Sequence, residues 1–221
     1  MKTLLRIDAS ARGACQDVAS HRSISRQLAN NFQELWQMKQ LQGEVILRDV
    51  GREPPAFISE EWIAACFTPE NNRTAQQQQA LALSDRLIAE VAVADIILIA
   101  SPMYNYGMPA ALKAWFDQVI RINKTFSFDL ARGDFPLEPT LSGKTLVLLT
   151  SSGEFGFQPG GIREHMDHLV SHIRTLSRYL GVDQVFNLQV EYQEFGDERH
   201  LKSKQAAFDS LHDLVSKVSG H

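Results

Sequence analysis

The chain has 221 residues, of which 44% are hydrophobic, so it is long enough for one α/β unit with a large core. Its formal net charge of −4, with no long cluster of Lys and Arg, argues against nucleic-acid and membrane-surface binding. The first residues carry charges within their apolar run, and no segment approaches membrane-spanning length. We therefore expect one cytoplasmic domain over residues 1–221 that acts on small molecules.

Cys15 and Cys66 are the two cysteines, and they lie far apart without a CxxC motif. We expect unpaired thiols in a reducing compartment, although a fold that brought them together would allow a disulfide.

Apolar, β-branched runs alternate with helical patterns along the chain, which is typical of a parallel sheet built from βαβ units. The expected strands cover residues 3–8, 44–50, 95–101, 146–150 and 185–190. This order predicts an α/β, flavodoxin-like, doubly wound five-stranded parallel sheet with strand order 2-1-3-4-5 and helices on both faces. A ligand is expected where the order reverses, between the first and third strands.

Apolar residues at helical spacing predict five major helices. Their stripes are Ile24, Leu28, Phe32, Leu35 and Trp36; Leu81, Ser84, Leu87, Ile88 and Val91; Leu112, Trp115, Phe116, Val119 and Ile120; Met166, Leu169, Ile173, Leu176 and Leu180; and Phe208, Leu211, Val215 and Val218. A short helix is also expected after Ser59, with Trp62, Ala65 and Cys66 on its apolar face. Residues 125–129 alternate like a short strand or hairpin arm beside the cleft.

The third strand ends at Pro102 in a loop of aromatic and amide side chains. Tyr104 and Tyr106 offer flat faces, Asn105 offers donors and acceptors, and Gly107 permits positive φ or close backbone approach. These residues suit a flat ligand with polar edges. A rigid turn whose tyrosines cap the core explains this segment equally well.

Two further loops are expected at the same edge of the sheet. Ser10 follows the first strand, and Ser20, Ser23 and Ser25 stand at the start of a helix, where free N–H groups and serine hydroxyls suit a phosphate. Taken alone, a serine N-cap is the commoner explanation, and GxGxxG and Walker motifs are missing. The small residues 151–154 after the fourth strand form the third loop, and agreement among the three loops favours a ligand site.

Four motifs stand in a fixed order: Ala80-Leu-Ala-Leu-Ser-Asp85, Pro102-Met-Tyr-Asn-Tyr106, Pro109-Ala-Ala-Leu-Lys-Ala-Trp115 with Asp117, and Leu149-Thr-Ser151-Ser-Gly153. Together they resemble the FMN-dependent NADH-azoreductase and NADH:quinone oxidoreductase family over nearly the whole chain. The resemblance implies a flavodoxin-like homodimer with one FMN per subunit and active sites at the dimer interface. It also implies ping-pong turnover, in which NADH or NADPH reduces flavin N5 and a quinone or azo compound is then reduced.

The resemblance also assigns residues to parts of the flavin. Ser10, Ser23, Ile24 and Ser25 match the phosphate loop; Pro102, Met103, Tyr104, Asn105 and Tyr106 match the loop along the isoalloxazine; and Ser151, Ser152, Gly153 and Glu154 match the loop at its pyrimidine end. Phe128 and Tyr179 are candidates for the walls of the substrate slot, or else ordinary packing aromatics.

Two features depart from the family pattern. The first loop is lengthened through residues 12–19, and Ser152 and Glu154 stand where Arg and Gly are common. A carboxylate at position 154 is expected to disfavour an anionic flavin or a nicotinamide phosphate.

Other functions remain as alternatives. One is a non-catalytic flavodoxin-like electron carrier, although the weak charge and the long excursions at residues 51–75 and 121–143 favour a roofed substrate pocket. Others are an FAD-dependent quinone reductase and an interaction domain without a cofactor. His165, His168 and His172 share one predicted helix face, but no carboxylate or cysteine completes a ligand set, so we expect no metal.

Overall fold

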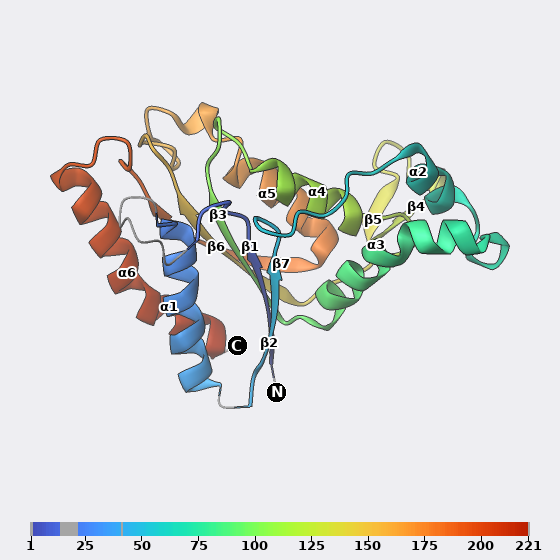
Figure 1. Cartoon of the computed structure of the whole chain (residues 1–221), viewed down its shortest axis with the longest axis horizontal. Helices are drawn as coiled ribbons and strands as arrows, with labels where there is room; N and C mark the ends of the chain where they lie inside the picture. Colours follow the sequence, from blue (N-terminus) through green and yellow to red (C-terminus); the bar gives the residue numbers. More distant parts are fainter. Residues whose placement is uncertain (1, 14–21, 41, 221) are drawn as a thin grey trace.

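A computed structural model describes residues 2–13, 22–40 and 42–220 of the chain. Its main sheet has five parallel strands in the order β2-β1-β3-β6-β7, which confirms the predicted doubly wound topology (Figure 1). In chain order these strands are β1 (Thr3–Asp8), β2 (Glu44–Asp49), β3 (Ile96–Pro102), β6 (Lys144–Ser151) and β7 (Val182–Val190). The strand order reverses between β1 and β3, so the chain leaves their carboxyl ends toward opposite faces of the sheet, which is where ligands bind in folds of this kind.

Two helices cover one face of the sheet, α1 (Ile24–Lys39) and α6 (Glu198–Ser219). The predicted stripe of α1 is largely buried against Leu4, Leu98 and Val147 of the sheet. Ser23 caps α1, because its Oγ accepts a hydrogen bond from the N–H of Arg26. The first turn of α1 thus starts at the edge where β1 and β3 end.

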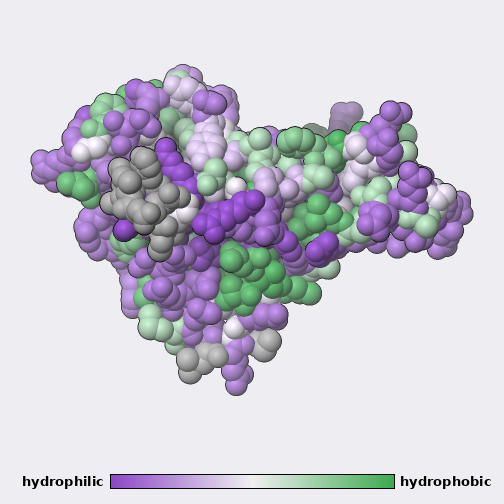
Figure 2. All heavy atoms as spheres, viewed as in Figure 1, coloured by the Kyte–Doolittle hydropathy of each residue, from purple (hydrophilic) through white to green (hydrophobic). Residues whose placement is uncertain are grey.

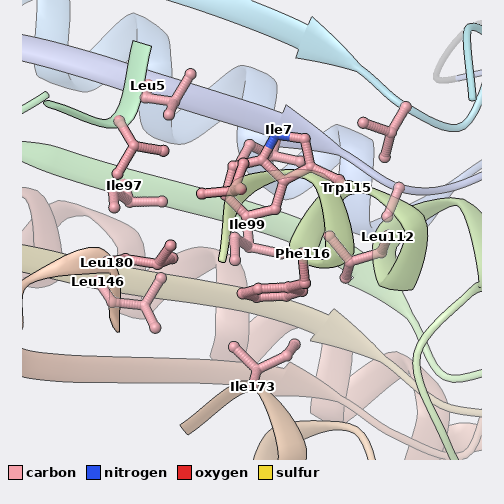
Figure 3. Close-up of a cluster of buried hydrophobic side chains, with 14 of the residues drawn as sticks. Leu5, Ile7, Ile97, Ile99, Leu112, Trp115, Phe116, Leu146, Ile173 and Leu180 are labelled. Carbon is pink, nitrogen blue, oxygen red and sulfur yellow. The ribbon is translucent and has the colours of Figure 1, made fainter. Parts of the chain in front are cut away.

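The opposite face is covered by α3 (Ala75–Val93), α4 (Ala110–Val119) and α5 (Val170–Ser177). Leu112, Trp115 and Phe116 of α4 point toward Ile7 and Ile99 of the sheet (Figure 3). The buried residues of α3 are those of the predicted stripe, including Ser84. Pro109 stands just before α4 rather than within its first turn.

The edge strand β2 differs from the central strands in burial. Every residue of β3 before Pro102 is buried, whereas β2 has no fully buried residue, because it has a sheet neighbour on one side only. Hydrophobic side chains consequently gather at the surface over β2 (Figure 2), where Leu47 is exposed.

One end of the molecule projects beyond the sheet, and we call it the arm (residues 56–82 and 122–140). It contains α2 (Glu60–Phe67), the first part of α3, and a small antiparallel sheet of β4 (Phe126–Phe128) and β5 (Leu137–Pro139). The predicted cap at Ser59 and the predicted hairpin arm are confirmed, but the hairpin lies on the arm and not beside the cleft at the ends of β1 and β3, as had been expected. Short 3-10 turns, η2 (Glu70–Asn72) and η3 (Leu130–Arg132), complete the arm.

The predicted single helix through the three histidines is wrong. The segment divides into η4 (Glu164–Met166), α5 and η5 (Arg178–Leu180). It breaks because the N–H of His168 donates to the carbonyl of Tyr106, while the Asp167 carboxylate accepts from the N–H groups of residues 169 and 170. The histidines therefore share no continuous helix face.

Within the described ranges, no helix is both long and apolar enough to cross a membrane. Over the same ranges, no group of three or more His, Cys, Asp or Glu side chains is arranged to hold a metal ion. Cys15 and Ser20 lie outside the described residues, and Cys66 is a buried free thiol.

Candidate functional site

A cavity of about 230 Å³ lies where the three predicted loops meet. Its walls come from the loop after β1, the start of α1, the end of β3, the end of β6 and the loop after β7. The lining residues are Ser10, Arg12, Arg22, Ser23, Ile24, Pro102, Met103, Tyr104, Ser151, Gly153, Gln193 and Glu194. The structure thus brings together eight of the thirteen predicted cofactor-binding residues and places Ser25, Asn105, Tyr106, Ser152 and Glu154 outside the lining.

The first wall combines a helix start with two arginines. Ser10 and Ser23 are buried, and Ser25 lies behind them with its Oγ 3.2 Å from the Oγ of Ser23. Ser23 and Ile24 at the start of α1 line the cavity, and the first turn contains no acidic residue, so no charge on that turn opposes the helix dipole. With Arg12 and Arg22 in the lining, this wall has the chemistry of an anion site.

A buried charge network holds that wall in place. The guanidinium of Arg26 donates to the carbonyl of Ser10 at 2.6 Å and pairs with Asp8 at 3.1 Å and Asp49 at 2.5 Å. Arg6 pairs with the same carboxylate oxygen of Asp8 at 2.8 Å and also donates to its second oxygen at 2.9 Å. Burial by itself raises the pKa of Asp49, but the hydrogen bond and charge of Arg26 outweigh it and lower that pKa below its ordinary value.

Gly51 allows its own backbone and that of Ser10 to approach closely beside the Arg26 network. A Cβ atom on Gly51 would lie 2.1 Å from the carbonyl oxygen of Ser10, closer than real Cβ atoms approach. The N–H of Gly51 also donates to the carbonyl of Asp8. Sequence reasoning missed the supporting roles of Arg26, Asp49 and Gly51, because their partners are distant in the chain.

The second wall is a tight hairpin over residues 104–107. Tyr104 and Gly107 exchange two backbone hydrogen bonds of 3.0 Å, and the central residues Asn105 and Tyr106 have φ of 47° and 65°. This is the geometry of a type I′ turn. The positive φ falls on Asn105 and Tyr106, whereas Gly107 has neither a positive φ nor a close neighbour, so its predicted role is wrong.

Asparagine tolerates the left-handed region, but a bulky aromatic residue adopts it only at a cost of about 1 to 2 kcal/mol. Tyr106 is therefore a strained residue held by its surroundings. The N–H groups of Asn105 and Tyr106 make no hydrogen bond within the described residues, and both residues are exposed. Two adjacent donors thus stand without a partner among the described residues, on a hairpin whose Tyr104 lines the cavity.

The third wall joins the loops after β6 and β7. The N–H groups of Tyr192, Gln193 and Glu194 donate to the carbonyls of Glu154, Ser152 and Gly153 at 3.1 to 3.2 Å. This pairing carries the side chains of Gln193 and Glu194 into the lining, which sequence reasoning missed. The sequence feature that could have identified these two residues is their position shortly after the fifth strand, because the carboxyl ends of parallel strands meet at one edge of a sheet.

Glu154 is not a free charge in the cavity. Its carboxylate accepts a hydrogen bond from the hydroxyl of Tyr106 at 2.9 Å and pairs with Arg163 at 3.1 Å. The hydrogen bond to Glu154 raises the pKa of Tyr106, because it is available only to the protonated phenol. The carboxylate that does line the cavity is that of Glu194.

Phe128 and Tyr179 lie away from this cavity. Phe128 lines a second, mostly apolar groove of about 500 Å³ on the arm, together with Trp62, Phe67 and Phe126. Tyr179 lies outside the lining of both, and its ring packs edge-on against Phe126 with centroids 5.6 Å apart.

Comparison with known proteins places the chain in a family. A family model described as having a flavodoxin-like fold matches residues 2–215. The chain is 58% identical over 219 residues to FMN-dependent NADH:quinone oxidoreductase 2 of Idiomarina loihiensis, covering 99% of this chain and 91% of that protein. It is 56% identical to the protein of the same name from Colwellia psychrerythraea, covering 99% and 100%. The chain therefore belongs to this flavodoxin-like family, together with these oxidoreductases.

Solved structures agree on the fold. The azoreductase from Bacillus anthracis str. Sterne superposes with a TM-score of 0.83 at 17% identity, covering 98% of this chain and 100% of that one. An FMN-dependent NADH-azoreductase from Bacillus anthracis str. Ames Ancestor, solved in complex with FMN, gives a TM-score of 0.83 at 16% identity, covering 99% and 100%.

Proposed function

We propose that this protein is an FMN-dependent oxidoreductase that transfers electrons from NADH to quinones. The observation that carries the proposal is the convergence of an anion-binding wall, a hairpin with two free N–H groups and a small-residue loop on one cavity. The family relatives named FMN-dependent NADH:quinone oxidoreductases support it.

The residues fit FMN at each end. Ser10, Ser23 and the N-terminus of α1 would hold the phosphate, with Arg12 and Arg22 balancing its charge. The free N–H groups of Asn105 and Tyr106 would serve flavin N5, while the side chain of Asn105 and Gly153 would bind the polar edge of the ring. Ser25, Ser152 and Glu154 do not line the cavity. They would instead support the residues that contact the cofactor.

Bound FMN would supply the redox chemistry, namely hydride acceptance from a reduced nicotinamide and two-electron reduction of a quinone. The protein would contribute position and electrostatics. Donors at the hairpin and the pyrimidine-end loop would stabilise negative charge on the reduced ring, and the flat faces of Tyr104 and Tyr106 would flank it.

Ping-pong turnover, use of NADPH and reductive cleavage of azo compounds are further parts of the proposal. A donor and an acceptor that stack in turn on one open ring face cannot bind together, and an azo dye is as flat as a quinone. A homodimer is also proposed, because Phe128 and Tyr179 do not line the cavity of their own chain and a second copy would have to supply such walls. A cytoplasmic location stays a prediction.

The test begins with the cofactor. The purified protein is heat-denatured, and the released nucleotide is identified by chromatography against FMN and FAD. Oxidation of NADH and NADPH is then followed separately with benzoquinone and with methyl red, varying both substrates. We expect FMN, NADH-dependent quinone reduction and parallel double-reciprocal lines. Release of FAD would favour an FAD-dependent quinone reductase. Bleaching of the flavin by NADH without turnover of any acceptor would favour a non-catalytic electron carrier.

A further inference from the structure

Three side chains link the hairpin to the loop after β6. The hydroxyl of Tyr106 donates to one carboxylate oxygen of Glu154, and Arg163 pairs with the other. Arg163 is fixed in turn, because its guanidinium donates to the carbonyl of Phe155 at 3.1 Å and lies 4.7 Å from the centre of the Phe155 ring. We call this arrangement the tether.

The tether acts on the one strained residue of the hairpin. Type I′ turns favour Asn followed by Gly, and here Tyr106 occupies the glycine position with φ of 65°. Strain of this kind persists only where the surroundings determine the conformation. Besides Glu154, those surroundings are the ring of Phe157, 6.3 Å from that of Tyr106, and the N–H of His168, which donates to the carbonyl of Tyr106 at 3.0 Å.

The tether also joins the two loops that flank the ring site. The hairpin carries the free N–H groups of Asn105 and Tyr106. Glu154 is the next residue in the chain after Gly153, which lines the cavity. A further backbone bond from the N–H of Met103 to the carbonyl of Ser151 spans the same gap at 2.7 Å. Glu154 thus connects the two walls through its contact with Tyr106 without itself lining the cavity.

We propose that Glu154 is a positioning residue, which holds Tyr106 and the free N–H groups of the hairpin in the flavin-binding conformation before the cofactor arrives. The proposal rests on the proposed function, since it names FMN as the ligand. Its physical basis is preorganisation. If the hairpin spends only part of its time in the conformation that binds FMN, the apparent affinity for FMN is reduced by that fraction.

The variants separate position from charge. Glu154→Asp keeps the charge but shortens the side chain, so one carboxylate no longer reaches both Tyr106 and Arg163. Tyr106→Phe keeps the ring and removes the hydroxyl. Glu154→Gln removes the charge, and Glu34→Gln is a matched control because Glu34 is exposed on α1 outside the cavity lining.

Two measurements are made on each variant. Amide hydrogen exchange of residues 103–108 is followed in the protein stripped of flavin, and FMN affinity is measured by quenching of flavin fluorescence. We expect faster exchange at Tyr104 and Gly107 in the Asp and Phe variants. We also expect FMN binding to weaken by about three- to tenfold, the size of one hydrogen bond at a partly exposed site, and the double variant Tyr106→Phe/Glu154→Asp to be no worse than the more affected single one.

Other results would contradict the tether, the positioning role of Glu154 or the proposed function, and they can be told apart. Unchanged exchange in both variants, or additive losses in the double variant, would overturn the tether. Normal FMN affinity in Glu154→Asp combined with weakened affinity in Glu154→Gln would overturn positioning and leave a purely electrostatic role. If the wild-type protein binds no FMN at all, the proposed function is overturned. Hydrogen exchange would then still show whether the tether holds the hairpin in place.

Discussion

At the residue scale, the candidate site depends on a few backbone conformations that particular side chains tolerate. Asn105 occupies the left-handed region, where asparagine is the most readily accepted residue after glycine. Its backbone N–H and its amide side chain both face the rim of the cavity in our proposal, so the two contributions need separate tests.

We predict that Asn105→Ala weakens FMN binding about tenfold or slows flavin reduction by NADH, while the protein still folds. The alanine loses the amide and also resists the left-handed conformation, at a cost of about 1 kcal/mol. Asn105→Gly is the matched control, because it keeps the conformation and lacks only the amide. Wild-type affinity in Asn105→Gly would mean that the side chain makes no contact with the flavin.

We predict that Gly51→Ala lowers the free energy of unfolding by about 2 kcal/mol or more, because its Cβ would collide with the backbone of Ser10. Gly107→Ala should change it little, since the nearest atom to its added Cβ lies 3.9 Å away and its φ is not positive. Urea denaturation of both variants measures the difference. Equal effects would show that the approach of Gly51 to Ser10 carries no special cost.

At the element scale, the Arg26 network locks the start of α1 to the ends of β1 and β2. The guanidinium is buried and contacts Asp8, Asp49 and the carbonyl of Ser10. Removing it would leave the buried carboxylate of Asp8 with Arg6 alone. Losing one partner of a buried ion pair typically costs 3–5 kcal/mol, so we expect Arg26→Met to destabilise the protein on the order of 3 kcal/mol.

We predict a pH signature for the same network. The folded-state pKa of Asp49 is lowered, so its charged form stabilises the fold above the unfolded pKa of about 3.9, and that contribution is lost as pH falls through the folded value. Asp49→Asn should therefore destabilise the protein by about 1 to 2 kcal/mol at pH 7, and the difference should shrink progressively as the pH falls below about 4. Urea midpoints across this range measure it, and a pH-independent difference would contradict the assignment.

At the scale of the whole molecule, the arm carries several exposed aromatic side chains close to an apolar groove. Phe57, Phe67 and Phe135 are 75%, 71% and 82% exposed, beside the apolar groove that contains Phe128. We propose that residues 1–221 form one domain, because the two main core clusters pack on opposite faces of the same sheet, and that a second copy of this domain covers the arm.

We predict that Phe67→Ala weakens self-association by about 30-fold, which corresponds to an interface anchor of 2 kcal/mol. Light scattering after size-exclusion chromatography over a dilution series measures the dimer. Met38→Ala is the control, because Met38 is also apolar and is 65% exposed but lies on α1. A monomer at all concentrations, or equal weakening by both substitutions, would remove the arm from the interface.

The order of the strands and the buried stripes of α1, α3, α4 and α6 could be predicted from the residue pattern, and eight of the residues that line the cavity were predicted with the help of the family resemblance. The strands and helices follow from local rules: the period of apolar residues distinguishes strand from helix, and a parallel sheet brings the ends of its strands to one edge. The stripe on α3 was predicted to the residue, including the buried Ser84.

How these parts support one another depends on contacts that form only in the folded chain. The pairing of Glu154 with Tyr106 and Arg163, the contacts of Arg26, and the entry of Gln193 and Glu194 into the cavity each join residues from separate segments. The break of the predicted histidine helix has the same origin, because the backbone of His168 bonds to that of Tyr106. Such contacts are set by three-dimensional packing, and a pattern confined to one segment contains no information about its partner.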